Sequence, residues 1–437
     1  MHARERVARN LAAAFLADAW TSRALLKQAA AVLGLRARKL QRRLVAELIE
    51  ATPDDYPPSP DWLVAFLLRS RPFNQASKNL PSTHVVLTPA RFAPAERFAS
   101  LDVPRLATPS DLAQWLDISI DQLDWLSDAR RQQGRTDIPI LQHHRYSFAP
   151  KRSGPPRLIE ASKPKLMAIQ RRILRAMLDV VPVHDCAHGF VAGRSCLGAA
   201  QVHAGEQIVI TVDLKDFFLN TRISRVHAIF RSLGYPWAVA RALTGLCSAS
   251  TPKSVFARLP PAQQHDWLTQ KIYQAPHLPQ GAPTSPAFAN LAAFRLDMRL
   301  AALARAYGAH YTRYADDLAF SGDHALATKT TTFLTALENI VRDQGFVLNS
   351  RKTRVMRRGR CQRITGIVVN DHVNVPRTAY DELKAILYNC CKNGPDTQNR
   401  ASLRDFRAHL EGRVAWVEQV NALRGQRLRG IFDEIRW

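Results

Sequence analysis

The 437-residue sequence lacks any long uninterrupted run of apolar residues, and none of its runs approaches the ~20 residues of a membrane-spanning helix. It also lacks the pattern of a signal peptide, because the basic start MHARERVARNLAAAF contains Glu5 and no cleavage-site pattern follows it. Cysteines are few and show neither CxxC spacing nor a disulfide framework. These absences predict a reduced, cytoplasmic protein that has no membrane partner. The six cysteines are Cys186, Cys196, Cys247, Cys361, Cys390 and Cys391.

Acidic residues are also in short supply. The chain has 37 aspartates and glutamates against 61 lysines and arginines, which gives a net charge of +24 and a pI near 10.4. An excess of this size favours a polyanionic partner over a merely soluble basic surface. The hydrophobic content of 46% indicates a folded globular protein, and the length is sufficient for two or three domains.

The pattern along the chain predicts an α+β fold in which helices alternate with short β-rich runs such as QIVITVDL, HYTRYA and RITGIVV. One helix should begin at ATPSDLAQWLDI, with Thr108 as its N-cap and Pro109 at the first helical position. Scattered prolines mark a linker before it. The predicted parts are a helical module at 1–70, a linker at 71–107, a mixed region at 108–375 and a helical tail at 376–437.

The stretch HYTRYADDLAFSGD, residues 310–323, sets Asp316 and Asp317 side by side between short runs of strand-forming residues. These flanks should carry both carboxylates into partly buried surroundings, where an unpaired charge is costly. Successive side chains on a strand point to opposite faces. We therefore expect YADD to lie at a hairpin tip, where the two carboxylates can converge on one point.

A two-metal phosphoryl-transfer site would need a further carboxylate from another strand. The best candidate is Asp213, which ends the β-like run Ile208–Val212 in IVITVDLKDFF. Carboxylate oxygens are the ligands that magnesium prefers. Taken alone, however, an Asp-Asp doublet is more often a solvated turn, and Asp213 could equally be a helix cap.

Several motifs follow one another in the order TVDLKDFF, LPQGAPTSPAFANL, RYADDLAFSG, GFVLNSRKT and RITGIVVN. This series resembles the palm of reverse transcriptases. The upstream stretches KRSGPPRLIEASKPKLMAIQRRIL and HGFVAGRSCLGAAQVHAG resemble their fingers. Within the family the likeness is greatest to bacterial retron-type enzymes, and it covers roughly residues 105–437. It implies a right-hand polymerase fold of fingers, palm and thumb, RNA-templated DNA synthesis, and two Mg²⁺ ions held by Asp213, Asp316 and Asp317.

The resemblance also implies nucleotide contacts. Phe218, five residues after Asp213, would be the bulky gate that excludes a 2′-hydroxyl. Gln280 and Gly281 would lie against nucleotide and template, because glycine permits close backbone approach. Lys352 would contact the triphosphate or act as a general acid. Three basic residues would clamp the triphosphate from the fingers, and these are Lys151, Arg152 and Arg157. Phe218 could instead be an ordinary core aromatic, and these three residues and Lys352 could be solvated surface charges.

Two segments depart from the retron pattern. The usual Asn-Ala-x-x-His reads AAQVH here, so that Ala199 replaces the asparagine while His203 is kept. The usual Val-Thr-Gly appears as Ile364, Thr365 and Gly366. In the family both segments are associated with recognising the cognate RNA and priming from it, so His203, Thr365 and Gly366 are expected to contact RNA or DNA.

Retron membership would imply a structured non-coding RNA as template and primer source, deoxynucleotide substrates, an RNA-linked DNA product, defence against phage and a possible protein effector. The tail RASLRDFRAHLEGRVAWVEQVN would be a thumb in which Arg404, Arg407 and Arg413 touch phosphates. The chain ends without the DNA-binding and nuclease regions of intron-encoded relatives, which argues against an intron maturase. The alternatives are a non-retron defence-associated or domesticated reverse transcriptase and a non-catalytic nucleic-acid scaffold.

The front of the chain, KQAAAVLGLRARKLQRRLVAELIEATPDDY, has a pattern of its own. Ala29–Val32 should form a short helix and Gly34 a turn, with a second helix beginning near Arg36. This pattern resembles helix-turn-helix DNA-binding units of the arabinose-regulator type, although a helical bundle with a basic exterior would read the same way. In the second helix the inward stripe would be Leu40, Leu44 and Leu48, and the nucleic-acid-binding face would be Arg36, Lys39 and Arg43.

Overall fold

The computed structural model describes residues 3–17, 20–34, 38–52, 58, 60–77, 90–128, 132–151 and 154–437. The chain forms two compact units, and each of them is built from two separate stretches of sequence. The first unit comprises Met1–Pro182 and Phe218–Ala292, and the second comprises Val183–Phe217 and Ala293–Trp437.

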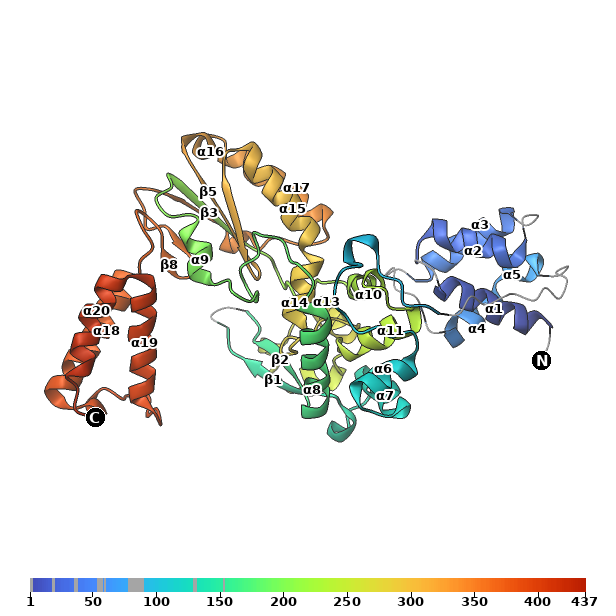
Figure 1. Ribbon diagram of the computed structural model, residues 1–437, viewed down its shortest axis with the longest axis horizontal. Helices are drawn as coiled ribbons and strands as arrows, with labels where there is room; N and C mark the ends of the chain where they lie inside the picture. The colour runs from blue at the N-terminus through green and yellow to red at the C-terminus, as the bar shows by residue number, and fades with distance from the viewer. Residues whose placement is uncertain are drawn as a thin grey trace. The chain divides into compact units, whose positions relative to one another are not determined.

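The front of the first unit is a cluster of helices (Figure 1). Its helices are α1 (Ala3–Ala17), α2 (Ser22–Leu33), α3 (Arg38–Glu50), α4 (Pro60–Arg69) and α5 (Arg71–Ala76). Leu11, Phe15, Leu25, Leu63 and Phe73 lie in its core, each fully buried. Because Phe73 belongs to this core, the helical packing extends past residue 70 into the stretch predicted to be linker.

The predicted pair of helices around Gly34 is present, with two differences. The first helix is longer than expected, because the Thr21 side chain accepts a hydrogen bond from the Ala24 amide and caps α2. Gly34 ends that helix with φ +75°, as the glycine turn predicts. In α3, Leu44 and Leu48 are buried as expected, but the full stripe is Gln41, Leu44, Val45 and Leu48, and Leu40 is only half-buried.

The rest of the first unit contains a two-stranded antiparallel hairpin, in which His144 pairs with Ser162 and Ala149 with Arg157. The predicted N-cap is confirmed, because the Thr108 hydroxyl accepts a hydrogen bond from the Asp111 amide. The strands are β1 (His144–Ala149) and β2 (Arg157–Ser162), and the helices are α6 (Pro109–Leu116), α7 (Ile120–Leu126), α8 (Pro164–Ile173), α10 (Ile223–Ser232), α11 (Trp237–Leu246), α12 (Lys253–Phe256), α13 (Trp267–Gln274) and α14 (Ser285–Ala292). Single turns are η2 (Glu96–Phe98), η3 (Gln133–Arg135), η4 (Pro139–Leu141), η5 (Leu174–Leu178) and η6 (Pro261–Gln263).

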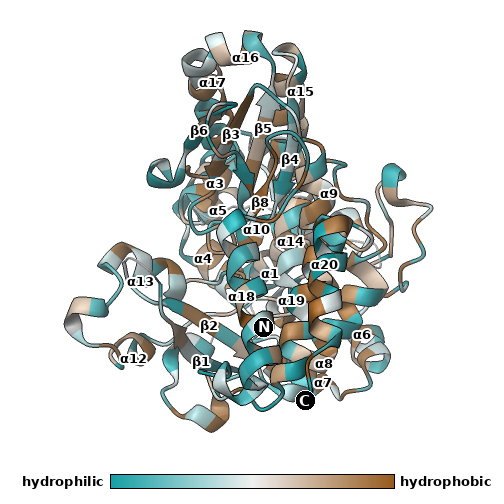
Figure 2. Cartoon of the chain, turned by 90° about the vertical axis from the view of Figure 1, so that its left-hand side faces the viewer, coloured by the Kyte–Doolittle hydropathy of each residue, from teal (hydrophilic) through white to brown (hydrophobic). Residues whose placement is uncertain are grey.

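The second unit contains an antiparallel four-stranded sheet in the order β4-β5-β3-β6. Figure 2 shows its four strands lying almost side by side. β3 is central, so its run of apolar residues is buried. Helices α15 and α17 lie on one side of the sheet, and α9 lies on the other (Figures 1 and 2). The strands are β3 (Ile208–Asp213), β4 (His310–Tyr314), β5 (Asp317–Gly322) and β6 (Arg354–Arg357), and the helices are α9 (Cys196–Gln201), α15 (Phe294–Ala306), α16 (His324–Thr328), α17 (Thr330–Asp343) and the single turn η7 (Ser350–Lys352).

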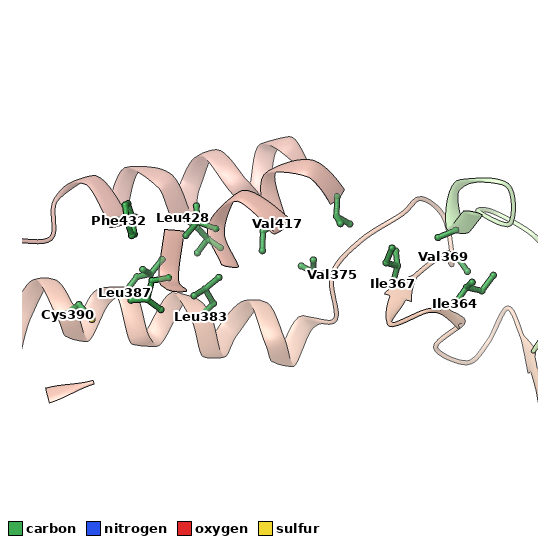
Figure 3. Packing of buried hydrophobic residues seen from close by; sticks show 14 of the residues in the cluster. Ile364, Ile367, Val369, Val375, Leu383, Leu387, Cys390, Val417, Leu428 and Phe432 are labelled. Atoms are coloured by element: carbon green, nitrogen blue, oxygen red, sulfur yellow. The ribbon is translucent and has the colours of Figure 1, made fainter. Parts of the chain in front are cut away.

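The C-terminal part of the second unit is a small hairpin followed by three helices, and these helices lie within the stretch 376–437. Leu383 and Leu387 on α18 face Leu428 and Phe432 across the helix pair, and the apolar cluster continues through Val375 to the hairpin (Figure 3). The elements are β7 (Arg363–Ile364), β8 (Ile367–Val368), α18 (Arg377–Asn393), η8 (Pro395–Thr397), α19 (Phe406–Val420) and α20 (Ala422–Asp433). Among the described residues, no helix is both long enough and apolar enough to cross a membrane.

Candidate active site

The acidic doublet lies at a hairpin tip, as its flanking strands predict. Tyr314 and Asp317 are register partners at the ends of β4 and β5, so Ala315 and Asp316 form the turn between them. Asp317 is in turn the register partner of Asp213 at the end of β3. Because directly opposed residues of paired strands share a face of the sheet, the carboxylates of Asp213 and Asp317 are neighbours. The Leu214 amide, 2.9 Å from the Asp316 carbonyl oxygen, ties the turn to the end of β3.

The three aspartates are buried to different degrees. Asp213 is 5% exposed and Asp316 is half-buried, whereas Asp317 keeps more contact with solvent than the sequence predicted. Partial desolvation and the charges of Asp316 and Asp213 raise the pKa of the Asp317 carboxyl to about 6, although Lys352 acts in the opposite direction. Desolvation and the neighbouring like charges both disfavour the ionised form of this carboxyl. A bound cation would relieve that repulsion.

A lysine supplies the positive charge that meets these carboxylates in the structure. The Lys352 Nζ atom lies 2.6 Å from Asp213 Oδ1. This hydrogen bond, together with the charges of the three aspartates, raises the pKa of the Lys352 ammonium. Asn349 was not identified from the sequence, yet its side-chain amide lies 3.2 Å from Asp213 Oδ2 and its backbone amide 2.8 Å from the Asp213 carbonyl oxygen. The only sequence signal for Asn349 was its place in GFVLNSRKT, three residues before Lys352.

A cavity of about 580 Å³ brings several of the predicted residues together. Its lining includes Asp213, Asp317 and Lys352, and also the two segments that depart from the retron pattern, at Ala199 and at residues 364–366. Ala199, which replaces the family's asparagine, is fully buried although it belongs to the lining of this cavity. Both departures therefore lie beside the candidate catalytic carboxylates.

Thr365 and Gly366 form the two-residue turn between β7 and β8, with φ +48° and +89°. Two successive residues with positive φ are typical of the tight turns that join twisted strands. Glycine adopts this conformation readily, but a β-branched threonine rarely does. Strain of this kind is often concentrated at functional sites, which supports the predicted role of Thr365 without testing it.

His203 is placed differently from the prediction. Its ring is fully buried, with Nδ1 2.7 Å from the Ser321 hydroxyl and Nε2 2.8 Å from the Thr312 hydroxyl. Burial lowers the pKa of the imidazole to about 3, so the ring is neutral. A buried neutral ring that bridges β4 and β5 has no surface to offer to RNA. The expected direct contact is therefore corrected to a structural role inside the second unit.

The predicted nucleotide-binding loop lies in the first unit, against β2. The Glu160 amide donates to the Gln280 carbonyl oxygen at 2.8 Å. Gly281 has φ +133°, and a Cβ atom at this position would lie 3.1 Å from the Glu160 carbonyl oxygen. Gly281 thus allows a close backbone approach, as predicted, but the backbone that it approaches in the structure is that of β2.

A buried ion pair that was not identified from the sequence lies beneath this loop. Glu160 Oε2 is 2.7 Å from His277 Nε2, and the two side chains are 0% and 2% exposed. The Thr251 hydroxyl donates to the other carboxylate oxygen at 2.6 Å, and His277 Nδ1 lies 2.8 Å from the Ala275 carbonyl oxygen. Both ring nitrogens of His277 therefore face oxygen atoms, an arrangement that favours a doubly protonated imidazolium beside an ionised Glu160.

The remaining predicted contacts are still predictions. Phe218 is half-buried, Lys151 is exposed, and Arg157 is exposed at the start of β2. These residues belong to the first unit, whereas the three aspartates belong to the second. Arg152 lies outside the described residues.

The basic faces predicted at the two ends of the chain are largely exposed. In α3, Lys39 and Arg43 are exposed, and Arg36 lies outside the described residues. Arg404 and Arg407 are exposed near the start of α19, whereas Arg413 lies 3.4 Å from the Glu382 carboxylate. Nucleic-acid contacts by these residues also remain predictions.

Comparison with known proteins identifies the class. Residues 149–384 match the family described as reverse transcriptase (RNA-dependent DNA polymerase). The retron Mx65 reverse transcriptase of Myxococcus xanthus is 38% identical over 336 residues, which cover 76% of this chain and 73% of that protein. The retron Mx162 reverse transcriptase of the same organism is 34% identical, and the match covers 76% of this chain and 67% of that protein. The retron Ec86 reverse transcriptase of Escherichia coli is 29% identical, and the match covers 60% of this chain and 72% of that protein. The chain belongs to the retron-type reverse transcriptases and is an RNA-directed DNA polymerase.

Proposed function

We propose that this enzyme copies a structured non-coding RNA into RNA-linked single-stranded DNA, and that Asp213, Asp316 and Asp317 hold two Mg²⁺ ions for the reaction. The observation that carries the proposal is the pairing of Asp213 with Asp317 across β3 and β5, with Asp316 in the adjoining turn. Carboxylates from two strands thereby meet at one point of the sheet.

The donors at this point fit a hard divalent cation. All of them are oxygens, and a cation would relieve both causes that raise the pKa of Asp317, which are its desolvation and the charges of Asp316 and Asp213. Within the described parts of the chain, no three His, Cys, Asp or Glu side chains are arranged as a ready-made metal cluster. Magnesium commonly takes only one or two carboxylates and completes its coordination with substrate phosphates. The site thus fits ions that bind together with the nucleotide.

When bound, the two ions would activate the primer hydroxyl and neutralise the leaving pyrophosphate. The residues of the chain would do the rest. Lys352 keeps its proton because its pKa is raised, so it can contact the triphosphate or protonate the leaving group once it separates from Asp213. Phe218 would close the space beneath the sugar, and the Gln280–Gly281 backbone would lie along the nucleotide and template.

Membership of the retron type supports a further proposal about the RNA template and the biological role of the DNA product. We propose that a dedicated RNA supplies both template and primer, that Thr365 and Gly366 contact it beside the carboxylates, and that the product acts in anti-phage defence with a protein effector. Support for the contact comes from the shared cavity, which is lined by the turn at 365–366 together with Asp213 and Asp317.

We also propose that the front helices bind nucleic acid. Lys39 and Arg43 are exposed on α3, whereas Leu44 and Leu48 are buried in the core of the helical cluster. This arrangement leaves a cationic helix face available to phosphates. The bound species could be the cognate RNA, the DNA product or a target.

The test is to sequence the nucleic acid that copurifies with the full chain expressed from its native locus, with the Asp316→Asn variant as the control. We expect one defined RNA–DNA species with the parent enzyme and the RNA alone with the variant. A heterogeneous mixture of RNAs, or DNA of equal amount with both proteins, would contradict the proposal.

A further inference from the structure

The turn that carries Asp316 is attached to helix α15 by an ion pair that is completely buried. Arg313 on β4 and Asp297 on α15 are both 0% exposed. Arg313 Nε lies 2.8 Å from Asp297 Oδ1 and Nη2 lies 2.6 Å from Oδ2, which is the two-pronged geometry of a strong arginine–carboxylate pair. The remaining nitrogen, Nη1, donates to the Ala315 carbonyl oxygen at 3.1 Å. The guanidinium therefore joins the helix to the turn.

The contact at Ala315 is informative because this residue adopts an unusual conformation. Its φ is +57°, in the left-handed region that residues with a side chain seldom adopt, and it directly precedes Asp316. The turn is confined from the other side by Gly189, where a Cβ atom would lie 2.5 Å from the Ala315 amide nitrogen. The backbone between the two strands is thus held from two directions.

A gain in stability does not explain why this ion pair is buried. Removing two charges from water is expensive, and hydrophobic replacements of a buried ion pair are often as stable or more so. A fully buried pair is better explained if its directional hydrogen bonds fix the conformation of the backbone that they contact. Here the bond to Ala315 connects the pair to a candidate metal-holding turn.

We propose that Arg313 and Asp297 are positioning residues, which hold the Ala315–Asp317 turn so that its carboxylates face Asp213 before metal and nucleotide bind. This inference rests on the proposed metal-holding role of the aspartates. Neither residue touches the reacting atoms. Their effect reaches the site through the Ala315 carbonyl oxygen.

The test compares Arg313→Lys with Tyr311→Phe in the full chain. Lysine keeps the charge beside Asp297 but cannot make the two-pronged pair and the bond to Ala315 at once. The Tyr311 hydroxyl donates to the same Asp297 oxygen at 2.9 Å, so Tyr311→Phe removes a hydrogen bond from the network and spares the contact with Ala315. Three readouts are measured: thermal unfolding, Mn²⁺ binding followed by the electron paramagnetic resonance signal of free Mn²⁺, and the Mg²⁺ concentration for half-maximal primer extension.

We expect Arg313→Lys to weaken Mn²⁺ binding and to raise the Mg²⁺ half-saturation by about 10- to 100-fold, as losing a group that orients metal ligands commonly does. Tyr311→Phe should stay within about threefold of the parent in both measurements, well below that range. If both variants lose thermal stability and neither changes metal binding, the pair is purely structural and the inference is overturned.

Two further variants keep the outcome decisive. If Arg313→Lys does not fold, the double variant Arg313→Met with Asp297→Asn removes both buried charges and leaves an acceptor for Tyr311, and it should show the same weakened metal binding. Asp316→Asn reports on the underlying assumption. If Asp316→Asn binds Mn²⁺ as tightly as the parent, the proposed metal site is wrong. If Asp316→Asn binds Mn²⁺ more weakly but Arg313→Lys binds it as the parent does, only the positioning role is rejected.

Discussion

Replacing Glu160 with glutamine removes the negative member of the buried pair beneath the Gln280–Gly281 loop. Burial alone would raise the pKa of Glu160, but the charge of His277 and its hydrogen bond outweigh burial, and the pKa is lowered. For His277, burial acts to lower the pKa, but the charge of Glu160 and the hydrogen bonds to Glu160 and Ala275 raise it. Each partner thus stabilises the charged form of the other.

The pH dependence follows from these two directions. The raised pKa of His277 contributes stability that is complete below its ordinary value of 6.5 and is lost as pH rises through the folded value above it. The lowered pKa of Glu160 contributes stability that is complete above its ordinary value of 4.5 and is lost as pH falls through the folded value below it. The stabilisation should therefore be greatest between these two ordinary values and should decline on the alkaline side.

The two single substitutions should differ in cost. In Glu160→Gln the new amide can donate to a neutral His277, so no charge is left buried, and we expect a loss of about 1.5–3 kcal/mol near pH 6, the range for a hydrogen bond to a charged group. His277→Leu leaves Glu160 buried without its partner, and the loss should be about 3–5 kcal/mol. In a unit of this size that corresponds to a fall in melting temperature of roughly 6–20 °C.

The assay is thermal unfolding of the full chain from pH 5.5 to pH 9, with Glu338→Gln on the exposed face of α17 as the matched control. The control should keep the parental profile, because surface substitutions rarely change stability by more than about 0.5 kcal/mol. Glu160→Gln should flatten the alkaline decline. If its profile runs parallel to the parent at every pH, the pair is not ionised in the folded protein and this reasoning is refuted.

The other predictions concern the site and the front helices. Asp316→Asn or Asp317→Asn should abolish primer extension on an RNA template while folding and RNA binding persist, because charge is lost where transition-state charge develops; full activity of either variant would reject the metal assignment. Phe218→Ala should admit ribonucleotides, and an unchanged ratio of ribo- to deoxynucleotide incorporation in an active variant would show that Phe218 is not the gate. Replacing Arg36, Lys39 and Arg43 with glutamine in the full chain should lower the salt slope of nucleic-acid binding by about one unit for each lost phosphate contact, with primer extension on a generic template unaffected. Unchanged salt dependence would instead favour a protein-docking role for these helices.

The features that could be predicted from the sequence depend on neighbouring residues. The hairpin around Asp316 follows from two strand-forming runs separated by a short turn, and the helix start at Thr108 follows from its capping pattern. The end of β3 at Asp213 follows from a continuous apolar run. Each of these features is determined by fewer than about ten consecutive residues, the scale on which periodicity and capping act.

The meeting of Asp213 with the doublet was predicted from the order of the motifs, but other contacts between residues far apart in the chain could not be predicted. Lys352 and Asp213 are 139 residues apart, and Glu160 and His277 are 117 apart. Residue type also misleads where burial decides the role. His203 was expected to contact nucleic acid because the family's Asn-Ala-x-x-His segment is associated with RNA recognition, yet the fold places its ring between two hydroxyls inside the protein. Gln41 replaces Leu40 in the buried stripe because its amide donates to the Gly34 carbonyl oxygen at 2.6 Å.

The charge balance of the site explains why a strongly basic protein would keep three carboxylates where a polyanion must bind. Asp213, Asp316 and Asp317 carry three negative charges at neutral pH when ionised, and Lys352 offsets one of them. A nucleoside triphosphate would be repelled by the two charges that remain. Two divalent cations would convert this deficit into two net positive charges beside the triphosphate, whereas a single cation would only neutralise it. Electrostatics thus favours two ions over one, and it predicts that Lys352→Met, which removes the lysine's offsetting charge, should tighten Mn²⁺ binding even as it slows nucleotide addition. Weaker Mn²⁺ binding in that variant would show that Lys352 supports the ions and does not compete with them for Asp213.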